Sequence, residues 1–320
     1  MGKAETRESI SGYALEEPFQ NLGGNASWTF AEKDGKNWFV KRFYDPVWPM
    51  NPEHLDPKRV ERSRERCVRF YNNKRKFYDA VNACGNGNIV TIHDFFRWES
   101  HYYVVTERIP AADFDMTYVS ERPTEVKLVL LKVLASNFLR LHEKGIVYAD
   151  LCPDNVLLKK TATGSITAKL IDFDGSFFEN DPPKNGGLPI RDGYISPETA
   201  DIYYNEIDHI VTRKVDVFTL GLMFHLYWTG ALPTFNTEKY PCVGAAVLEG
   251  EKPTVDGAIP EKLRLLIERM LSREPADRPD MVEVFHCLKD DLEAKTEKEL
   301  DSSAKTELVA PSFWSVPSDV

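Results

Sequence analysis

The sequence predicts an α+β fold in which an antiparallel sheet with one main helix precedes a mostly helical half. Two patterns carry this prediction. Over the first 110 residues, apolar and polar residues alternate in short runs around one long helical stretch. From Thr124 onward, apolar residues recur instead at spacings of three and four. At 320 residues and 42% hydrophobic composition, the chain is long enough to bury a core in each half.

The first half begins with a predicted β-hairpin. Residues 28–42, "WTFAEKDGKNWFVKR", alternate on both sides of Asp34-Gly35, a pair typical of a hairpin turn. From Pro57 to Gly85, apolar residues recur at helical spacing, which predicts one long helix with an apolar face. Residues 88–109, "NIVTIHDFFRWESHYYVVTERI", then predict two further strands with a turn at residues 98–101.

The second half is predicted to be helical. Residues 124–145 form an amphipathic pattern, with Thr124 as the expected N-cap and Gly145 as the stop. Further helices are predicted at about 215–229, 260–272 and 279–292, and the first of these is apolar nearly all round, as in a buried helix. Past residue 292 the sequence indicates a charged tail, in which Phe313 and Trp314 are candidates for docking on a protein surface.

Composition excludes several classes of function. The formal net charge of −10 provides no positive field for a nucleic-acid backbone, so no nucleic-acid partner is expected. Five widely spaced cysteines without a CxxC pair indicate reduced thiols, which predicts a cytoplasmic location. We expect neither a membrane partner nor a signal peptide, because no apolar run of about 18 residues and no leader pattern occur.

Two polar motifs interrupt the apolar pattern of the second half. The stretch "IVYADLCPDNVLL", residues 146–158, contains Asp150, Asp154 and Asn155, and "KLIDFDGS", residues 169–176, contains Asp172. Each aspartate alone also fits a turn or an N-cap. With Lys41 on an earlier predicted strand, however, the motifs in this order resemble the protein kinase family over roughly residues 12–290.

The resemblance implies a bilobal protein-kinase fold with ATP and Mg²⁺ as cofactors and a protein as substrate. It divides the chain into an N-terminal extension (1–11), an N-lobe with hinge (12–109), a C-lobe (110–292) and the tail (293–320).

The same resemblance assigns roles to individual residues. Asp150 would accept the proton of the substrate hydroxyl, and Lys41 would neutralise the α- and β-phosphates. Asn155 and Asp172 would bind the metal. The residues expected around the nucleotide are Gly23 and Gly24 of the phosphate loop, Thr106 as gatekeeper, and the hinge from Glu107 to Ile109.

Three further matches are structural. Glu198 in "YISPE" and Arg278 in "REPADRP" should form a buried bidentate ion pair, and Asp216 should hydrogen-bond the backbone of the catalytic loop. Aminoglycoside and choline phosphotransferases share the catalytic aspartates but lack this set, which favours a protein kinase.

The sequence departs from the family around the nucleotide. Trp28 stands near the place of the third loop glycine, and Phe39 replaces a small residue. Asn73 and Lys74 fall where a glutamate partner of Lys41 is expected, so either Glu65 serves from a shifted helix or Lys41 is paired otherwise.

Further departures lie in the catalytic and activation segments. Ala149 replaces an arginine, and only Ser176 offers a hydroxyl between Asp172 and Gly193, which indicates activity that is not gated by loop phosphorylation. Cys152 replaces a lysine, and its side chain either fills space as a small neutral group or acts as a reactive thiol. Asp174 replaces a glycine.

Two functions therefore remain open, with a small-molecule kinase as a third. The first is a divergent Ser/Thr-type protein kinase that transfers the γ-phosphoryl group of ATP to a protein hydroxyl. The second is a pseudokinase, a signalling scaffold with or without bound nucleotide, favoured by Phe39, Lys74, Cys152 and the poor glycine loop.

Overall fold

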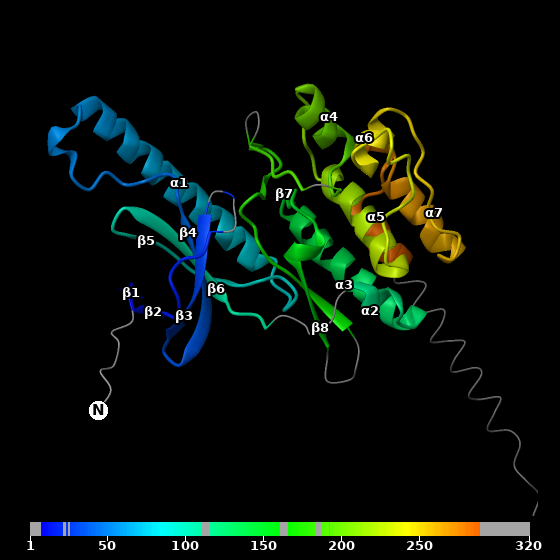
Figure 1. Cartoon of the computed structure of the whole chain (residues 1–320), viewed down its shortest axis with the longest axis horizontal. Helices are drawn as coiled ribbons and strands as arrows, with labels where there is room; N and C mark the ends of the chain where they lie inside the picture. The colour runs from blue at the N-terminus through cyan, green and yellow to red at the C-terminus, as the bar shows by residue number, and fades with distance from the viewer. Residues whose placement is uncertain are drawn as a thin grey trace, which may run out of the picture.

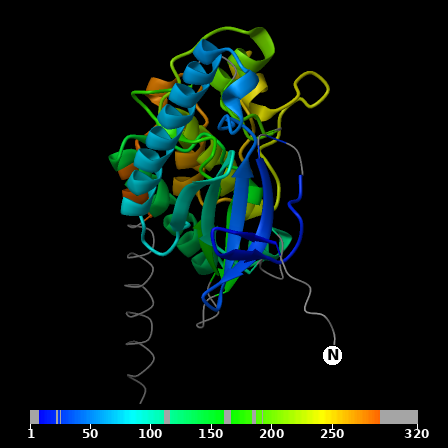
Figure 2. The same cartoon turned by 90° about the vertical axis from the view of Figure 1, so that its left-hand side faces the viewer.

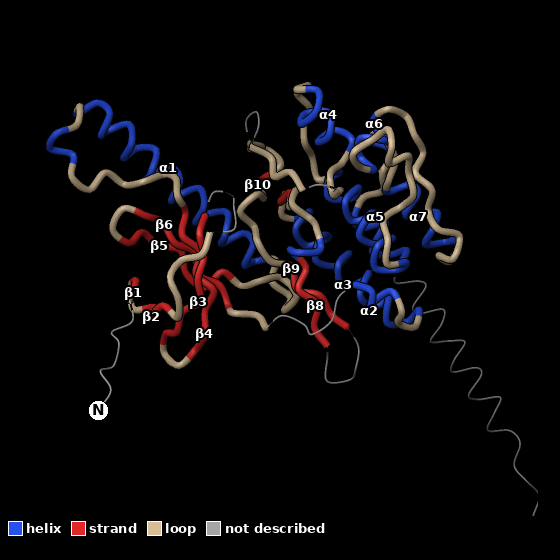
Figure 3. Tube along the Cα trace, viewed as in Figure 1, coloured by secondary structure: helices blue, strands red, loops and turns tan. Residues whose placement is uncertain are grey.

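The chain folds into a sheet-containing lobe followed by a helical lobe, as the sequence predicts (Figure 1, Figure 3). The computed structural model describes residues 8–21, 24, 26–110, 116–160, 166–183, 187–191 and 193–288. Phe313, Trp314 and the rest of the predicted tail lie outside the described residues. Within the described part, no helix is both long and apolar enough to traverse a lipid bilayer.

The first lobe contains a six-stranded antiparallel sheet with strand order β1-β2-β3-β4-β6-β5. The predicted hairpin is present, and its turn residues Asp34 and Gly35 have left-handed φ values of 54° and 69°, which a two-residue turn of this kind requires. The strands are β1 (Ser9–Ile10), β2 (Tyr13–Leu15), β3 (Ala26–Lys33), β4 (Lys36–Phe43), β5 (Ile92–Trp98) and β6 (His101–Glu107).

The sheet begins earlier than predicted. Ser9 and Ile10 pair with Ala14 and Tyr13, and the side chain of Ile10 is buried in the small core on the outer face of the sheet. The prediction of an extension over residues 1–11 was therefore wrong for these two residues. A strand of two residues is too short to show a period in the sequence.

Helix α1 (Pro57–Ala83) packs on the other face of the sheet (Figure 2). Its first turn is capped by the Asp56 side chain, which accepts a hydrogen bond from Lys58 N–H, and Pro57 occupies the first helical position. The predicted apolar face is the buried one, with Val60, Cys67, Phe77, Tyr78 and Val81 inside. The second half of α1 is thereby held against the sheet near the other lobe.

The second lobe is built on two long helices, α3 (Thr124–Glu143) and α5 (Lys214–Thr229). α5 is buried from Val215 to Trp228, in agreement with its continuous apolar sequence. The other helices are α2 (Met116–Ser120), α4 (Pro197–Asn205), α6 (Val243–Leu248), α7 (Glu261–Met270) and, within the described residues, a last helix over 281–288.

The N-terminus of α3 differs from the prediction. Thr124 is the first helical residue and Pro123 is the cap, without a side-chain hydrogen bond, so the expected threonine N-cap is wrong. A proline before the helix fixes the extended backbone that the cap position needs, and this leaves the threonine one position too late. At the other end Gly145 has a φ of 68°, which fits the predicted stop.

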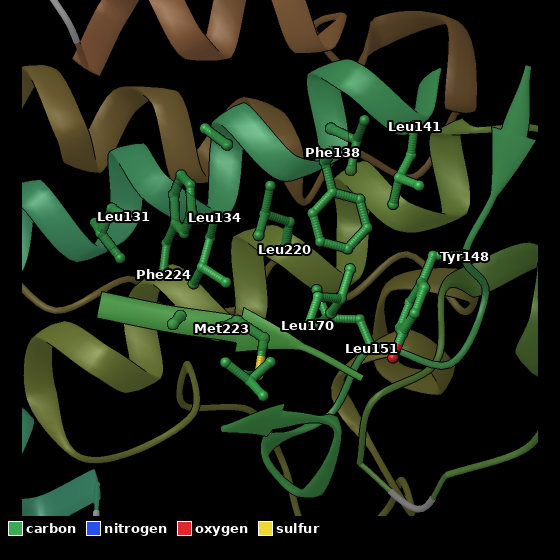
Figure 4. Close-up of a cluster of buried hydrophobic side chains, with 14 of the residues drawn as sticks. Leu131, Leu134, Phe138, Leu141, Tyr148, Leu151, Leu170, Leu220, Met223 and Phe224 are labelled. Atoms are coloured by element: carbon green, nitrogen blue, oxygen red, sulfur yellow. The ribbon is translucent and has the colours of Figure 1, made fainter. Parts of the chain in front are cut away.

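The core between α3 and α5 reaches the polar loop 148–155 through two buried residues of that loop (Figure 4). Tyr148 and Leu151, on either side of Asp150, are buried among side chains of both helices. Leu131, Leu134, Phe138 and Leu141 of α3 and Leu220, Met223 and Phe224 of α5 line this core together with Leu170.

Two short antiparallel ladders place the polar motifs side by side. β7 (Ile146–Val147) pairs with β10 (Phe177–Phe178), and β8 (Val156–Lys160) pairs with β9 (Ile166–Leu170). The loop 148–155 and the loop 171–176 are thus held at both of their ends, so their carboxylates have fixed positions relative to one another.

Candidate active site

The loop 148–155 is held in place by backbone hydrogen bonds to Asp216. This fully buried carboxylate on α5 accepts hydrogen bonds from Tyr148 N–H at 2.9 Å and from Ala149 N–H at 2.8 Å, and His142 Nε2 lies 3.0 Å from it. The contact expected from the sequence is present. Ala149 has a φ of 63°, an unfavourable conformation for a residue with a side chain, and the two bonds to Asp216 help to hold it there.

Asp150 lies at the centre of this loop with its carboxylate nearly buried. Its backbone carbonyl accepts a hydrogen bond from Asn155 Nδ2 at 2.7 Å, and its Oδ1 accepts one from Arg191 Nε at 3.2 Å. Burial raises the pKa of the Asp150 carboxyl, and the positive charge of Arg191 partly opposes that rise. Sequence reasoning missed Arg191, because an arginine in an irregular segment carries no pattern that marks its partner.

Asn155 and Asp172 are brought together by the ladder of β8 and β9. Val156 pairs with Leu170, and Ile171 N–H donates to the Asn155 carbonyl at 3.0 Å. These two side chains offer one carboxylate and one amide oxygen, donors that Mg²⁺ accepts when substrate phosphates supply further ligands. No group of three or more His, Cys, Asp or Glu side chains that could hold a metal occurs among the described residues, which such a phosphate-completed site does not need. The donor set therefore fits a nucleotide-bound Mg²⁺.

Lys41 reaches across from β4 to the second lobe. Its Nζ lies 2.8 Å from Asp172 Oδ2 and 2.9 Å from Asp174 Oδ2. Burial alone would lower the pKa of Lys41, but the negative charges of Asp174 and Asp172 raise it by more. The pKa of Lys41 is therefore raised, and its amine stays protonated. Glu65 is exposed on α1, and the alternative in which it pairs with Lys41 is wrong.

Lys74 and Tyr78 bring α1 to the same place. Lys74 Nζ donates to the backbone carbonyl of Asp174 at 3.2 Å, and Tyr78 OH donates to Asp174 Oδ1 at 3.4 Å. Burial lowers the pKa of Lys74, against the effect of the carboxylates of Asp174 and Asp172. The sequence marked Lys74 and Asp174 as separate departures from the family, but not as partners.

The face of the sheet that carries Lys41 also carries three aromatic rings. Phe39 stacks on Trp28 with ring centroids 5.6 Å apart and meets Phe30 edge-on at 6.0 Å. In the ladder Phe39 pairs with Thr106, the predicted gatekeeper, and Trp28 pairs with Lys41. The aromatic cluster Trp28/Phe30/Phe39 thus lies along the sheet between Lys41 and the end of β6.

The remaining predicted nucleotide contacts are partly described. Gly24 has a φ of 86°, a conformation that favours glycine, whereas Gly23 lies outside the described residues. Glu107 forms an ion pair with Lys169, and Ile109 packs half-buried against the main core. Their binding of an adenine edge stays a prediction.

The buried ion pair expected between Glu198 and Arg278 is present. Arg278 Nη1 and Nη2 donate to the two carboxylate oxygens of Glu198 at 2.7 and 2.8 Å, and both side chains are at most 6% exposed. Three backbone carbonyls, of Lys214, Ser272 and Arg273, accept the other hydrogen bonds of the guanidinium. All five N–H donors of Arg278 therefore have partners.

Cys152 and Ser176 are both buried. Burial raises the pKa of the Cys152 thiol, which fits a neutral filler better than a reactive thiolate. Ser176 Oγ donates to the Tyr148 carbonyl at 2.8 Å, so the hydroxyl supports the catalytic loop and is covered.

A family model described as the protein kinase domain matches residues 58–288, which is most of the chain. The chain belongs to the protein kinase family. The match begins inside the first turn of α1, so Gly24, in the loop before β3, and Lys41 on β4 both lie before it.

Similar proteins include several Ser/Thr kinases. The chain is 25% identical over 211 residues to a serine/threonine-protein kinase cds1 of Schizosaccharomyces pombe, covering 62% of this chain and 44% of that protein. It is 28% identical over 198 residues to a calcium/calmodulin-dependent protein kinase type II of Caenorhabditis elegans, covering 60% and 26%. A calcium/calmodulin-dependent serine/threonine-protein kinase of Malus domestica is 24% identical over 308 residues, covering 88% and 72%. The chain spans less than half the length of the first curated relatives it matches.

Proposed function

We propose that this kinase transfers the γ-phosphoryl group of ATP to a serine or threonine hydroxyl of a protein. The observation that carries the proposal is the convergence of Lys41, Asp150, Asn155 and Asp172, which come from β4, the loop 148–155 and the loop after β9. The similarity to kinases named for serine and threonine supports the choice of hydroxyl. A cytoplasmic location is proposed from the cysteine pattern alone.

Each residue has a separate task in this reaction. Asp150 accepts the proton of the attacking hydroxyl, for which its carboxylate must be ionised, and Arg191 occupies only its Oδ1. Lys41 would hold the α- and β-phosphates, and Asn155 and Asp172 would hold Mg²⁺, which would neutralise charge on the phosphoryl oxygens. Asp216 keeps the backbone of the catalytic loop in place through Tyr148 and Ala149.

We propose further that activity does not depend on phosphorylation of the activation segment. Ser176, the one hydroxyl between Asp172 and Gly193, is covered and bonded to Tyr148. At position 149 an alanine offers no charge that could bind a phosphate there.

The test is phosphate transfer from γ-labelled ATP in the presence of Mg²⁺, with the protein itself and a broad protein library as acceptors. Wild type is expected to label acceptors and to gain thermal stability when Mg²⁺ and ATP are added together, because a ligand that binds the folded state raises its melting temperature. Lys41→Met is expected to lose the labelling. Absence of labelling by wild type in every condition would refute the proposal.

Arg191 provides a prediction on the pH dependence of this reaction. Replacing Arg191 with Gln removes a positive charge beside Asp150, which makes the ionised carboxylate less favourable and raises its pKa further. The acidic limb of kcat/KM should therefore move to higher pH, and the size of the move is limited because the Arg191 side chain is half-exposed and solvent screens its charge. A pH–rate profile checks this, with Arg273→Gln on the exposed surface as the matched control. An acidic limb that stays in place in Arg191→Gln contradicts the prediction.

A second function is favoured by the aromatic cluster Trp28/Phe30/Phe39 and by Cys152. The rings occupy the sheet where small residues would admit a base, and a thiol replaces a lysine charge. These features suit a pseudokinase scaffold. The two functions separate in the same assay, because a scaffold gives no labelling even where nucleotide raises its melting temperature.

A further inference from the structure

Asp174 is the meeting point of three separate parts of the molecule. Its carboxylate accepts hydrogen bonds from Lys41 of β4 at 2.9 Å and from Tyr78 of α1 at 3.4 Å. Its backbone carbonyl accepts one from Lys74 of α1 at 3.2 Å, and its N–H donates to Asp172 Oδ1 at 3.2 Å. One residue thus joins the sheet, the long helix and the loop that carries Asp172.

Helix α1 has no carboxylate of its own directed at Lys41. Its acidic residues are Glu61, Glu65 and Asp79, and all three are exposed. The α1 side chains that reach the site are Lys74 and Tyr78, and both bind Asp174. Contact between α1 and Lys41 therefore runs through residue 174.

The two carboxylates beside Lys41, those of Asp172 and Asp174, differ in the other groups that they bind. Under the proposed function Asp172 would also bind Mg²⁺. Its carboxylate oxygens would then have fewer lone pairs left to accept a hydrogen bond from Lys41. Asp174 has Lys41, Tyr78 and Lys74 as its partners, all from the protein. It is the carboxylate that can stay with Lys41 throughout the reaction.

The formal charges of this cluster are balanced. Lys41 and Lys74 supply two positive charges, and Asp172 and Asp174 supply two negative charges. Removing the Asp174 charge leaves the ammonium groups of Lys41 and Lys74, both half-buried, with the single carboxylate of Asp172. The electrostatic attraction that keeps both ammonium groups in place is then weaker.

We infer that Asp174 is the positioning residue for Lys41 and that it links the placement of helix α1 to the nucleotide site. The inference deepens the proposed function and rests on it for the role of Lys41 toward phosphates. The link between α1 and Lys41 itself stands on the contacts alone.

The test compares Asp174→Asn with Asp79→Asn, an exposed control on α1, in the full chain. Without nucleotide, amide hydrogen exchange over residues 70–81 should rise about fivefold in Asp174→Asn and stay unchanged in the control, because local opening follows the loss of tertiary contacts. In the labelled-ATP assay kcat should fall about 10- to 100-fold, with a much smaller change in KM for ATP, as for a misplaced catalytic group. Unchanged exchange, or faster exchange with unchanged kcat, would overturn the inference.

Two further variants separate positioning from general damage. Lys74→Met keeps every carboxylate of the site, and it should also accelerate exchange over residues 70–81. Asp174→Asn combined with Lys74→Glu moves the negative charge onto α1, and it should recover at least about tenfold of the lost kcat. No recovery in a folded double variant argues against positioning by charge. If wild type transfers no phosphate, the proposed function fails, and the exchange measurements still decide whether Asp174 ties α1 to the site.

Discussion

Asp150→Asn is expected to lower kcat for phosphoryl transfer by about 10²- to 10⁴-fold, the usual contribution of a positioned base. The amide cannot take the proton of the substrate hydroxyl, although its size and its backbone contacts are unchanged. The backbone carbonyl of residue 150 still receives the Asn155 hydrogen bond at 2.7 Å, so the loop should keep its shape. Initial rates of transfer from labelled ATP give the measurement.

The matched control for this variant is Asp154→Asn. Asp154 lies in the same loop, four residues after Asp150, but its side chain is exposed. Its substitution should leave kcat within about twofold, because exposed side chains without partners contribute little. Equal losses in both variants would show that the loop, rather than the Asp150 carboxylate, had been damaged.

Arg278→Met is expected to lower the free energy of unfolding by about 3–5 kcal/mol. It leaves the Glu198 carboxylate in a buried place without its counter-charge, and it removes donors from the carbonyls of Lys214, Ser272 and Arg273. An uncompensated buried charge costs far more than the net stabilisation by the intact pair. Urea unfolding followed by circular dichroism measures the change.

Arg269→Met serves as its control on the surface of the same lobe. Arg269 pairs with Glu283, and both side chains are about half exposed, so water and salt screen the pair. The expected loss is at most about 1 kcal/mol. If Arg278→Met destabilises the protein no more than this, the buried pair does not support the lobe as described.

Most of the fold could be predicted where a repeating pattern was long enough. The hairpin around Asp34-Gly35, the helix from Pro57 and the buried helix α5 each span many residues with a clear period. α4 and α6 are short, and strands β7 to β10 have two to five residues each, so no period could develop in them. Their existence depends on pairing partners that are distant in the chain.

The candidate site could be predicted in part for a related reason. Asp150, Asn155 and Asp172 lie in two continuous motifs, and the structure brings these motifs together through the β8–β9 ladder. The partner of Lys41 could not be predicted, because it depends on how α1 approaches a loop about 100 residues later. Arg191 falls in the same class, since its contact with Asp150 arises from the path of an irregular segment.

The cluster of Lys41, Lys74, Asp172 and Asp174 also constrains how this protein can change over generations. A mutation to an acid at position 74 alone would set three carboxylates around one lysine, and a glycine at position 174 alone would leave two amines to share Asp172. Both single steps pass through a variant with unbalanced charge in a partly buried place, which selection on stability or activity opposes. We therefore expect positions 74 and 174 to change together among relatives of this protein.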